Sequence, residues 1–209
     1  MNYSKRMFVG WIGIAAVSLF AGAGYAQLAP DALVKGVADD VLKILSKSDT
    51  DAAAVAKAIE EKIVMHFDFE RMSRLAVGKS WRQASAEQQQ SIVQQFRALL
   101  LRSYTTAYSA ARGVVVDVRP VKLQPSDDDV QVKTQIRLPG GAPPITVDYS
   151  MFKATEVWKV YDVTVNEVSL VSTYRSTFSE QIKQGGVDGL IKALTEMNSK
   201  RTAAAQNKK

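Results

Sequence analysis

The sequence has no cysteine and a single histidine among its 209 residues. Without cysteine no disulfide can form, so packing alone must hold the fold together. Zinc sites generally use several His or Cys ligands, and a serine triad needs a histidine with a carboxylate partner. His66 lies in a largely apolar segment, where we interpret it as structural. These shortages argue against most metal and nucleophile chemistry, and we expect neither a metal nor a cofactor.

Glycine-rich phosphate loops and basic stripes are missing as well. Gly140-Gly141 and Gly185-Gly186 are isolated pairs without the strand-to-helix spacing of nucleotide motifs. The 27 basic and 21 acidic residues are interspersed along the chain, whereas nucleic-acid binding uses a concentrated basic stripe with aromatic partners. We therefore expect neither a nucleotide nor a nucleic acid as ligand.

The first 26 residues have the pattern of a signal peptide. A basic pair, Lys5-Arg6, precedes a 14-residue apolar run over residues 7–20, and small residues then lead to Ala26. No acidic residue comes before Asp31. This order of charge, apolar stretch and small-residue cleavage site is typical of secretion, with cleavage after Ala26 or, alternatively, Ala23. An uncleaved anchor is the weaker alternative, because roughly 20 apolar residues are needed to span a bilayer.

The mature chain is expected to be a free, soluble and monomeric protein of the periplasm. Removal of residues 1–26 takes away two of the 27 basic residues and none of the 21 acidic ones, which leaves a net charge of +4. No cysteine follows the cleavage site, so a lipoprotein anchor is excluded. The length suits one domain over residues 27–199. Residues 200–209 are rich in Ala and Lys without periodicity, which predicts a disordered tail.

The first half of the mature chain shows helical periodicity. Asp68 is a candidate N-cap, Ser85 with Gln88 forms a capping box, and Gly78 and Gly113 end the two helices that follow these caps. Two further helices near the C-terminus are separated by a glycine pair. The predicted helices cover residues 31–45, 51–65, 68–77, 85–112, 173–183 and 188–198.

After Gly113 the apolar period changes to two, which is typical of strands with one covered and one solvated face. Turn-forming Pro, Gly and Asp residues lie between the runs. In the last run, apolar residues occupy both odd and even positions, which predicts a central strand covered on both faces. The architecture is therefore α+β, a four-stranded antiparallel sheet with helices packed over one face. The predicted strands cover residues 114–119, 130–138, 145–151 and 157–165.

Large apolar side chains are expected between the sheet and its helices, where they either fill a core or line an apolar cavity. Periodicity does not separate the two, and a packed core is the favoured interpretation of the pattern alone. Tyrosine and methionine point the other way, since Met adapts to variable apolar ligands and Tyr offers a hydroxyl at a pocket mouth. The inward-facing candidates are Phe96, Leu100, Tyr104, Tyr108, Val132, Ile136, Val147, Tyr149 and Met151.

Two parts of the sequence carry a family resemblance. The first part comprises Phe-Asp-Phe-Glu-Arg-Met at 67–72, Gly-Lys-Ser-Trp-Arg-Gln-Ala at 78–84 and residues 96–104. The second comprises Trp-Lys-Val-Tyr-Asp-Val at 158–163 and Val-Ser-Leu-Val-Ser-Thr-Tyr-Arg-Ser-Thr-Phe at 168–178. In combination they resemble the MlaC family, also called the toluene-tolerance protein family, over essentially the whole mature chain. Asn166-Glu167 departs from the usual Glu-Gly of that family in a surface loop.

The resemblance implies an α+β domain that encloses an apolar cavity and carries a glycerophospholipid through the periplasm. The implied partners are an inner-membrane ABC transporter with an MCE-domain subunit and an outer-membrane lipoprotein–porin complex. The implied role is maintenance of outer-membrane lipid asymmetry, with phospholipid as cargo rather than cofactor. The acyl chains would contact the inward-facing residues, with Val160 and Leu170 as further candidates, and the headgroup would stay near solvent.

Two other functions are weaker hypotheses. Helix-plus-sheet domains can hold Asp/Tyr acid–base pairs, and Asp148-Tyr149 and Tyr161-Asp162 are candidates by residue type. Adjacent strand residues point to opposite faces, however, so neither pair can act together. We therefore do not expect an enzyme. A ligand-free structural or chaperone-like protein is the third hypothesis and would show a sealed core.

Overall fold

The computed structural model describes residues 28–47, 52–110, 113–155 and 157–206, and it describes side chains throughout these ranges except at 47, 52–53, 104–110 and 201–206. The predicted signal peptide therefore lies outside the described residues. Along the chain the elements are α1 (Pro30–Lys47), α2 (Ala52–Ile63), η1 (Val64–His66), α3 (Phe69–Val77), η2 (Gly78–Gln83), α4 (Ala86–Ala110), β1 (Val115–Val118), β2 (Asp129–Arg137), η3 (Pro139–Gly141), β3 (Ile145–Ala154), β4 (Val157–Val165), β5 (Val168–Ser169) and α5 (Leu170–Gln206).

The predicted helix caps are formed. The Asp68 carboxylate accepts the backbone N–H of Arg71 at 2.8 Å, at the start of α3. Before α4, the Ser85 hydroxyl accepts the N–H of Gln88 at 3.2 Å, and the Gln88 side chain accepts the N–H of Ser85 at 2.9 Å. This reciprocal pair is a capping box. Local hydrogen bonding of this kind explains why the starts of α3 and α4 are readable from the sequence.

Helix α5 contains the predicted glycine break but extends further than predicted at its C-terminal end. Its backbone is broken at Gly185 and Gly186, the latter with φ of 65°, so the predicted glycine break is present. The helix then continues to Gln206, through most of the segment from Lys200 for which the sequence predicts disorder. None of the helices in the described ranges is both long and apolar enough to cross a membrane.

The sheet is antiparallel, as predicted, but has five strands in the order β1-β2-β3-β4-β5 rather than four. The additional strand β5 pairs with the end of β4 through Val165 and Val168. The two residues between them, Asn166 and Glu167, have φ of 45° and 68°. Two positive φ values in a two-residue loop are typical of a type I′ hairpin turn, which strongly favours glycine at its second position. Glu167 at that position conceals the hairpin in the sequence.

Strand β4 is not the central strand of the sheet. A β-bulge explains why its apolar residues occupy both odd and even positions. Val160 pairs with Met151, whereas Asp162 pairs with Ser150, so Tyr161 is an extra residue in a β-bulge. A bulge shifts the alternation by one. Trp158 and Val160 lie before the bulge. They therefore share one sheet face with Val163 and Val165 after it, which oppose Tyr149 and Val147.

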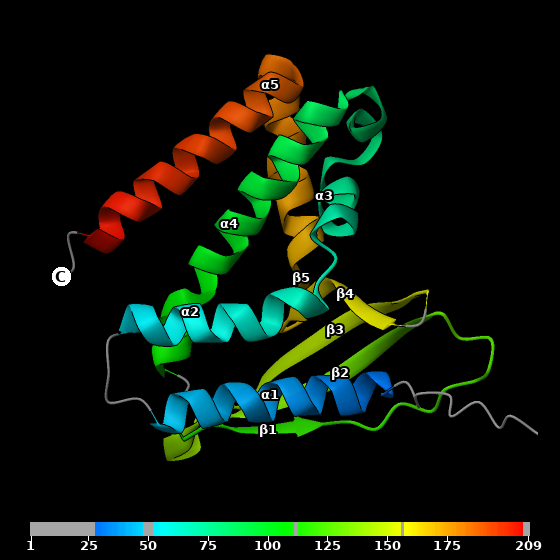
Figure 1. The fold of residues 1–209 in the computed structure, drawn as a ribbon, viewed down its shortest axis with the longest axis vertical. Helices are drawn as coiled ribbons and strands as arrows, with labels where there is room; N and C mark the ends of the chain where they lie inside the picture. The colour runs from blue at the N-terminus through cyan, green and yellow to red at the C-terminus, as the bar shows by residue number, and fades with distance from the viewer. Residues whose placement is uncertain (1–27, 48–51, 111–112, 156, 207–209) are drawn as a thin grey trace, which may run out of the picture.

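Helices meet the sheet in two places (Figure 1). Helix α1 lies across one face, while α3, α4 and α5 pack together beyond β4. The outer edge of β4 is met by the segment before α3, since Phe67 forms a parallel bridge with Val160 and the Asp68 N–H donates to the Val160 carbonyl at 2.8 Å.

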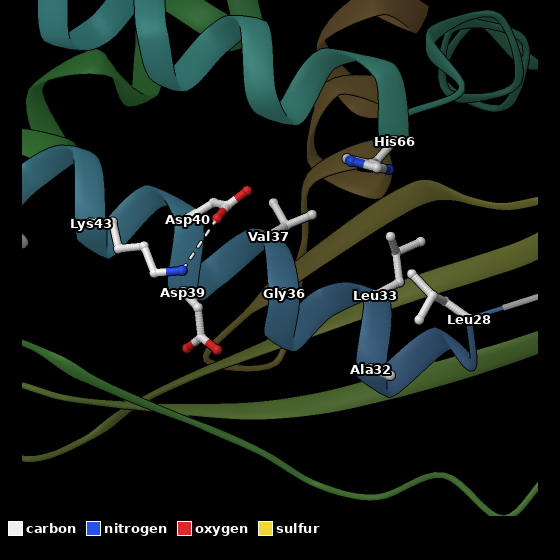
Figure 2. A pocket seen from close by; sticks show the side chains of 9 residues that line it. All are labelled: Leu28, Ala32, Leu33, Gly36, Val37, Asp39, Asp40, Lys43 and His66. Carbon is white, nitrogen blue, oxygen red and sulfur yellow. Dashed lines mark ion pairs between the residues drawn. The ribbon is translucent and has the colours of Figure 1, made fainter.

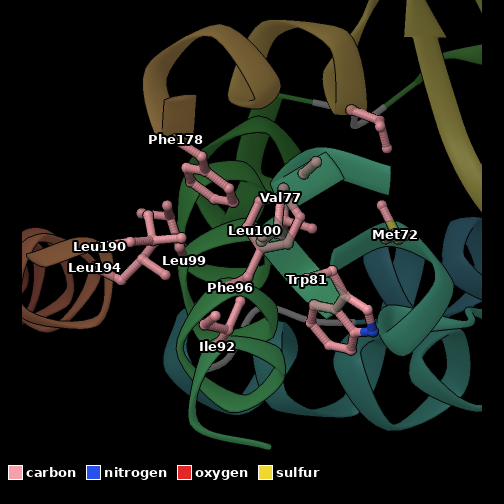
Figure 3. Packing of buried hydrophobic residues seen from close by; sticks show 12 residues of the cluster. Met72, Val77, Trp81, Ile92, Phe96, Leu99, Leu100, Phe178, Leu190 and Leu194 are labelled. Carbon is pink, nitrogen blue, oxygen red and sulfur yellow. The ribbon is translucent and has the colours of Figure 1, made fainter. Parts of the chain in front are cut away.

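The buried hydrophobic residues form two clusters. The helical cluster joins α3, η2, α4 and α5, with Phe178, Leu190 and Leu194 facing α4 and Trp81 anchoring η2 (Figure 3). The sheet cluster joins α1 to the sheet through Val34, Val132, Met151, Trp158 and Val160. Phe67 packs against both clusters.

Candidate functional site

One face of the sheet carries most of the predicted strand residues. Val132 opposes Tyr149, and Met151 opposes Val160, in the antiparallel ladders. Residues that oppose each other share a sheet face, so these side chains lie together beneath α1. Val132 and Met151 are fully buried, and Val147 is 7% exposed. The structure therefore assembles a continuous apolar surface from residues on three strands.

Two of the predicted residues lie at the margins of this surface. Ile136 opposes Ile145 near the turn between β2 and β3, and it is half-buried. Leu170 is the half-buried first residue of α5. Neither belongs to the sheet cluster.

The two predicted residues of α4 whose side chains the structure describes, Phe96 and Leu100, lie in the helical cluster and not in the sheet cluster. Phe96 packs edge-on against Tyr174 and Phe178 of α5, with ring centroids 4.9 and 5.0 Å apart. Leu100 belongs to the same helical cluster. Helical periodicity identifies both as buried, but it does not tell which neighbouring element covers them. The side chains of Tyr104 and Tyr108 lie outside the described residues.

A pocket of about 330 Å³ lies between α1 and η1 (Figure 2). Leu33 and Val37 rise from α1 toward His66, and Leu33 also packs against the sheet cluster. The pocket therefore adjoins the apolar sheet surface through one side chain. Its lining residues are Leu28, Ala32, Leu33, Gly36, Val37, Asp39, Asp40, Lys43 and His66.

Charged side chains surround one end of this pocket. Asp40 lies 3.8 Å from the Lys43 ammonium and 3.5 Å from that of Lys62. Asp39 pairs with Lys35 at 2.8 Å. All these side chains are largely exposed, so each pair contributes about 0–1 kcal/mol. The end of the pocket holds charges of both signs that solvent or a ligand can reach.

His66 forms the opposite wall, in surroundings that favour its neutral imidazole. Burial, followed by repulsion from Lys159, lowers the pKa of the imidazole below its ordinary value. The sequence interpretation of His66 as structural missed its place in a pocket wall. The sequence feature that could have indicated the pocket was Gly36, because it lies inside a predicted helix where no cap or turn requires glycine.

The acid–base pairs considered from the sequence have structural partners. The Asp162 carboxylate accepts hydrogen bonds from the Ser169 hydroxyl at 2.5 Å and from the Val171 N–H at 3.0 Å, which caps α5. The Tyr161 hydroxyl donates to Asp129 at 2.8 Å. Asp148 opposes Lys133 on the sheet face away from Val132. Asp162 therefore stabilises the start of α5, and Tyr161 is held to the start of β2.

The apolar sheet face and the adjoining pocket define an α+β domain with a site suited to an apolar ligand. The family model for the MlaC protein matches residues 35–196. The chain therefore belongs to the MlaC family.

Two relatives extend this comparison. The chain is 20% identical over 201 residues to the intermembrane phospholipid transport system binding protein MlaC of Haemophilus influenzae, covering 93% of this chain and 94% of the relative. Its fold matches the structure of a phospholipid-binding protein from Ralstonia solanacearum in complex with a phospholipid. That match has a TM-score of 0.74 and 34% identity, and covers 82% of this chain and 98% of the other.

Proposed function

We propose that this protein is a periplasmic carrier of glycerophospholipid. The observation that carries the proposal is the match to the Ralstonia phospholipid-binding protein, which was solved with a phospholipid and is covered over 98% of its length. The continuous apolar face of the sheet supports the same function, because it offers contact to acyl chains without charge. Both relatives are named for binding or transport, so we propose transport rather than catalysis.

The physical need for such a carrier follows from the cost of exposing acyl chains to water. Each buried methylene contributes about 0.8 kcal/mol, so two chains of about 15 carbons represent roughly 20 kcal/mol. A phospholipid therefore hardly leaves a bilayer unaided. A protein that encloses the chains in an apolar site lowers this barrier, and partner complexes must then promote release.

We propose that the acyl chains contact the face of the sheet beneath α1. Val132 and Met151 are fully buried there, so chains reach them only when α1 moves away from the sheet. The pocket of about 330 Å³ is near the small end of the range for drug-sized ligands, which also calls for additional space. The proposed contacts are Val132, Ile136, Val147, Tyr149, Met151 and Val160.

The compartment and partners belong to the same proposal. The chain is exported after loss of residues 1–26, and it meets an inner-membrane ABC transporter with an MCE-domain subunit and an outer-membrane lipoprotein–porin complex. The name of the Haemophilus relative, which places it in an intermembrane phospholipid transport system, supports this assignment.

Native mass spectrometry of the mature protein purified from the periplasm, followed by lipid extraction, tests the function. We expect a stoichiometric adduct with the mass of a phospholipid. Val147→Glu places a charge on the sheet face and should abolish the adduct, whereas Gln131→Glu on the opposite face should retain it. A wild-type protein that carries no lipid and takes none from vesicles would contradict the proposal, as would a folded Val147→Glu protein with full lipid content.

A further inference from the structure

We propose that the pocket between α1 and η1 is the mouth of the lipid site, where a zwitterionic headgroup and the first part of one acyl chain lie. This inference rests on the proposed function and adds where the lipid meets solvent and which headgroup class it carries. Four features support it: an unexplained glycine, an apolar wall, the link of that wall to the sheet cluster, and charges of both signs at one end.

Gly36 is the most informative residue of the pocket. It lies in the interior of α1, where glycine costs about 0.5–1 kcal/mol relative to alanine. Its φ is not positive, so the backbone does not require glycine, and a Cβ added there would meet no atom within 4 Å. Neither the backbone nor the packing therefore requires glycine, and the helix borders open space at this position. Ala32, one turn earlier on the same wall, is also small.

The apolar wall leads from solvent toward the sheet. Leu28 lies at the outer, solvent-exposed side of the pocket. Leu33 lines the pocket and packs against the sheet cluster. A chain that lies on Leu28 and Val37 thus continues over Leu33 to the proposed acyl site without crossing a polar layer.

The polar end matches a headgroup that has charges of both signs. Asp39 and Asp40 provide two carboxylates, and the lysines paired with them provide ammonium groups. Exposed pairs of this kind are weak, so a ligand phosphate can replace a carboxylate beside Lys43, and a ligand ammonium can replace a lysine beside Asp39.

Filling the pocket tests the assignment. Gly36→Trp places an indole in the open space and should abolish uptake of phospholipid from vesicles that contain equal amounts of phosphatidylethanolamine and phosphatidylglycerol. Ser46→Trp is the matched control, since Ser46 is an exposed residue of α1 that neither lines the pocket nor takes part in the ion pairs at its polar end. Circular dichroism should show both variants folded. Equal uptake by both variants would overturn this inference alone, whereas failure of the wild type to take up lipid would overturn the proposed function.

Photo-crosslinking provides a second test that does not depend on a folded Gly36→Trp variant. A phosphatidylethanolamine with a diazirine close to the glycerol should label α1 between Leu28 and Lys43, or His66. Labelling confined to α5 or to the sheet edge would overturn the assignment. In the mixed vesicles the wild type should bind phosphatidylethanolamine preferentially, and Asp39→Lys with Asp40→Lys should shift binding to phosphatidylglycerol. Equal binding of both lipids by the wild type would overturn the headgroup assignment.

Discussion

The guanidinium of Arg71 on α3 lies 3.1 Å from the carboxylate of Asp129 at the start of β2. It also lies over the rings of Phe152 and Tyr161, 4.0 and 4.2 Å from their centroids. The Tyr161 hydroxyl donates to the other oxygen of Asp129, and burial together with this bond raises the pKa of the phenol. Arg71 therefore connects the helical cluster to the sheet on the face opposite α1.

Replacing Arg71 by alanine should lower the free energy of unfolding by about 1–3 kcal/mol, because it removes two cation–π contacts and a charge-assisted hydrogen bond. Arg71→Lys keeps the charge but loses the planar stacking, so its loss should be intermediate. Urea unfolding monitored by circular dichroism measures both. A lysine variant as stable as the wild type would show that stacking on the two rings contributes nothing.

Glu167→Gly should raise the free energy of unfolding by up to about 1 kcal/mol. Glu167 has φ of 68°, a backbone conformation that costs non-glycine residues about 1–2 kcal/mol, and glycine's greater freedom in the unfolded state offsets part of the gain. Glu167→Ala removes the same carboxylate without relieving the backbone, and should show no gain. Equal stabilisation by both substitutions in thermal unfolding would assign the effect to charge instead.

Stability should fall as the pH drops below about 6.5, in part because of His66. Its pKa is lowered in the folded protein, first by burial and then by Lys159, so the unfolded chain binds a proton that the folded chain does not. The loss begins as pH falls through the ordinary value of 6.5 and ends below the lowered value. His66→Gln should flatten this part of the profile in urea unfolding at each pH. An unchanged slope would exclude His66 as its source.

Phe96→Ala should cost about 3–5 kcal/mol of stability, because Phe96 is fully buried against Tyr174 and Phe178. The phospholipid bound per folded molecule should stay that of the wild type, since these contacts lie in the helical cluster and not on the sheet face. Thermal unfolding and lipid extraction measure the two quantities. A stable variant without lipid would place Phe96 in the lipid site after all.

The sequence by itself determined the elements whose signals are local. Caps such as Asp68 and Ser85 act through hydrogen bonds within three residues, and an apolar period of two requires that alternate side chains share a face. The α+β class, the inward face of β2 and β3, and the glycine break near residue 185 all follow from such signals. The family resemblance was also carried by local motifs.

Only the tertiary structure decided features that depend on pairing between distant segments. The bulge at Tyr161 exists because β4 must pair with β3 while its apolar side chains before and after Tyr161 face α1. The periodicity of α4 predicts that Phe96 is buried, but it does not tell whether α5 or the sheet covers it. The contact with Phe178 shows that α5 does. The pocket beside Gly36 arises because η1 approaches α1. A sequence pattern states which side chains avoid water, whereas the packing of whole elements decides what they meet.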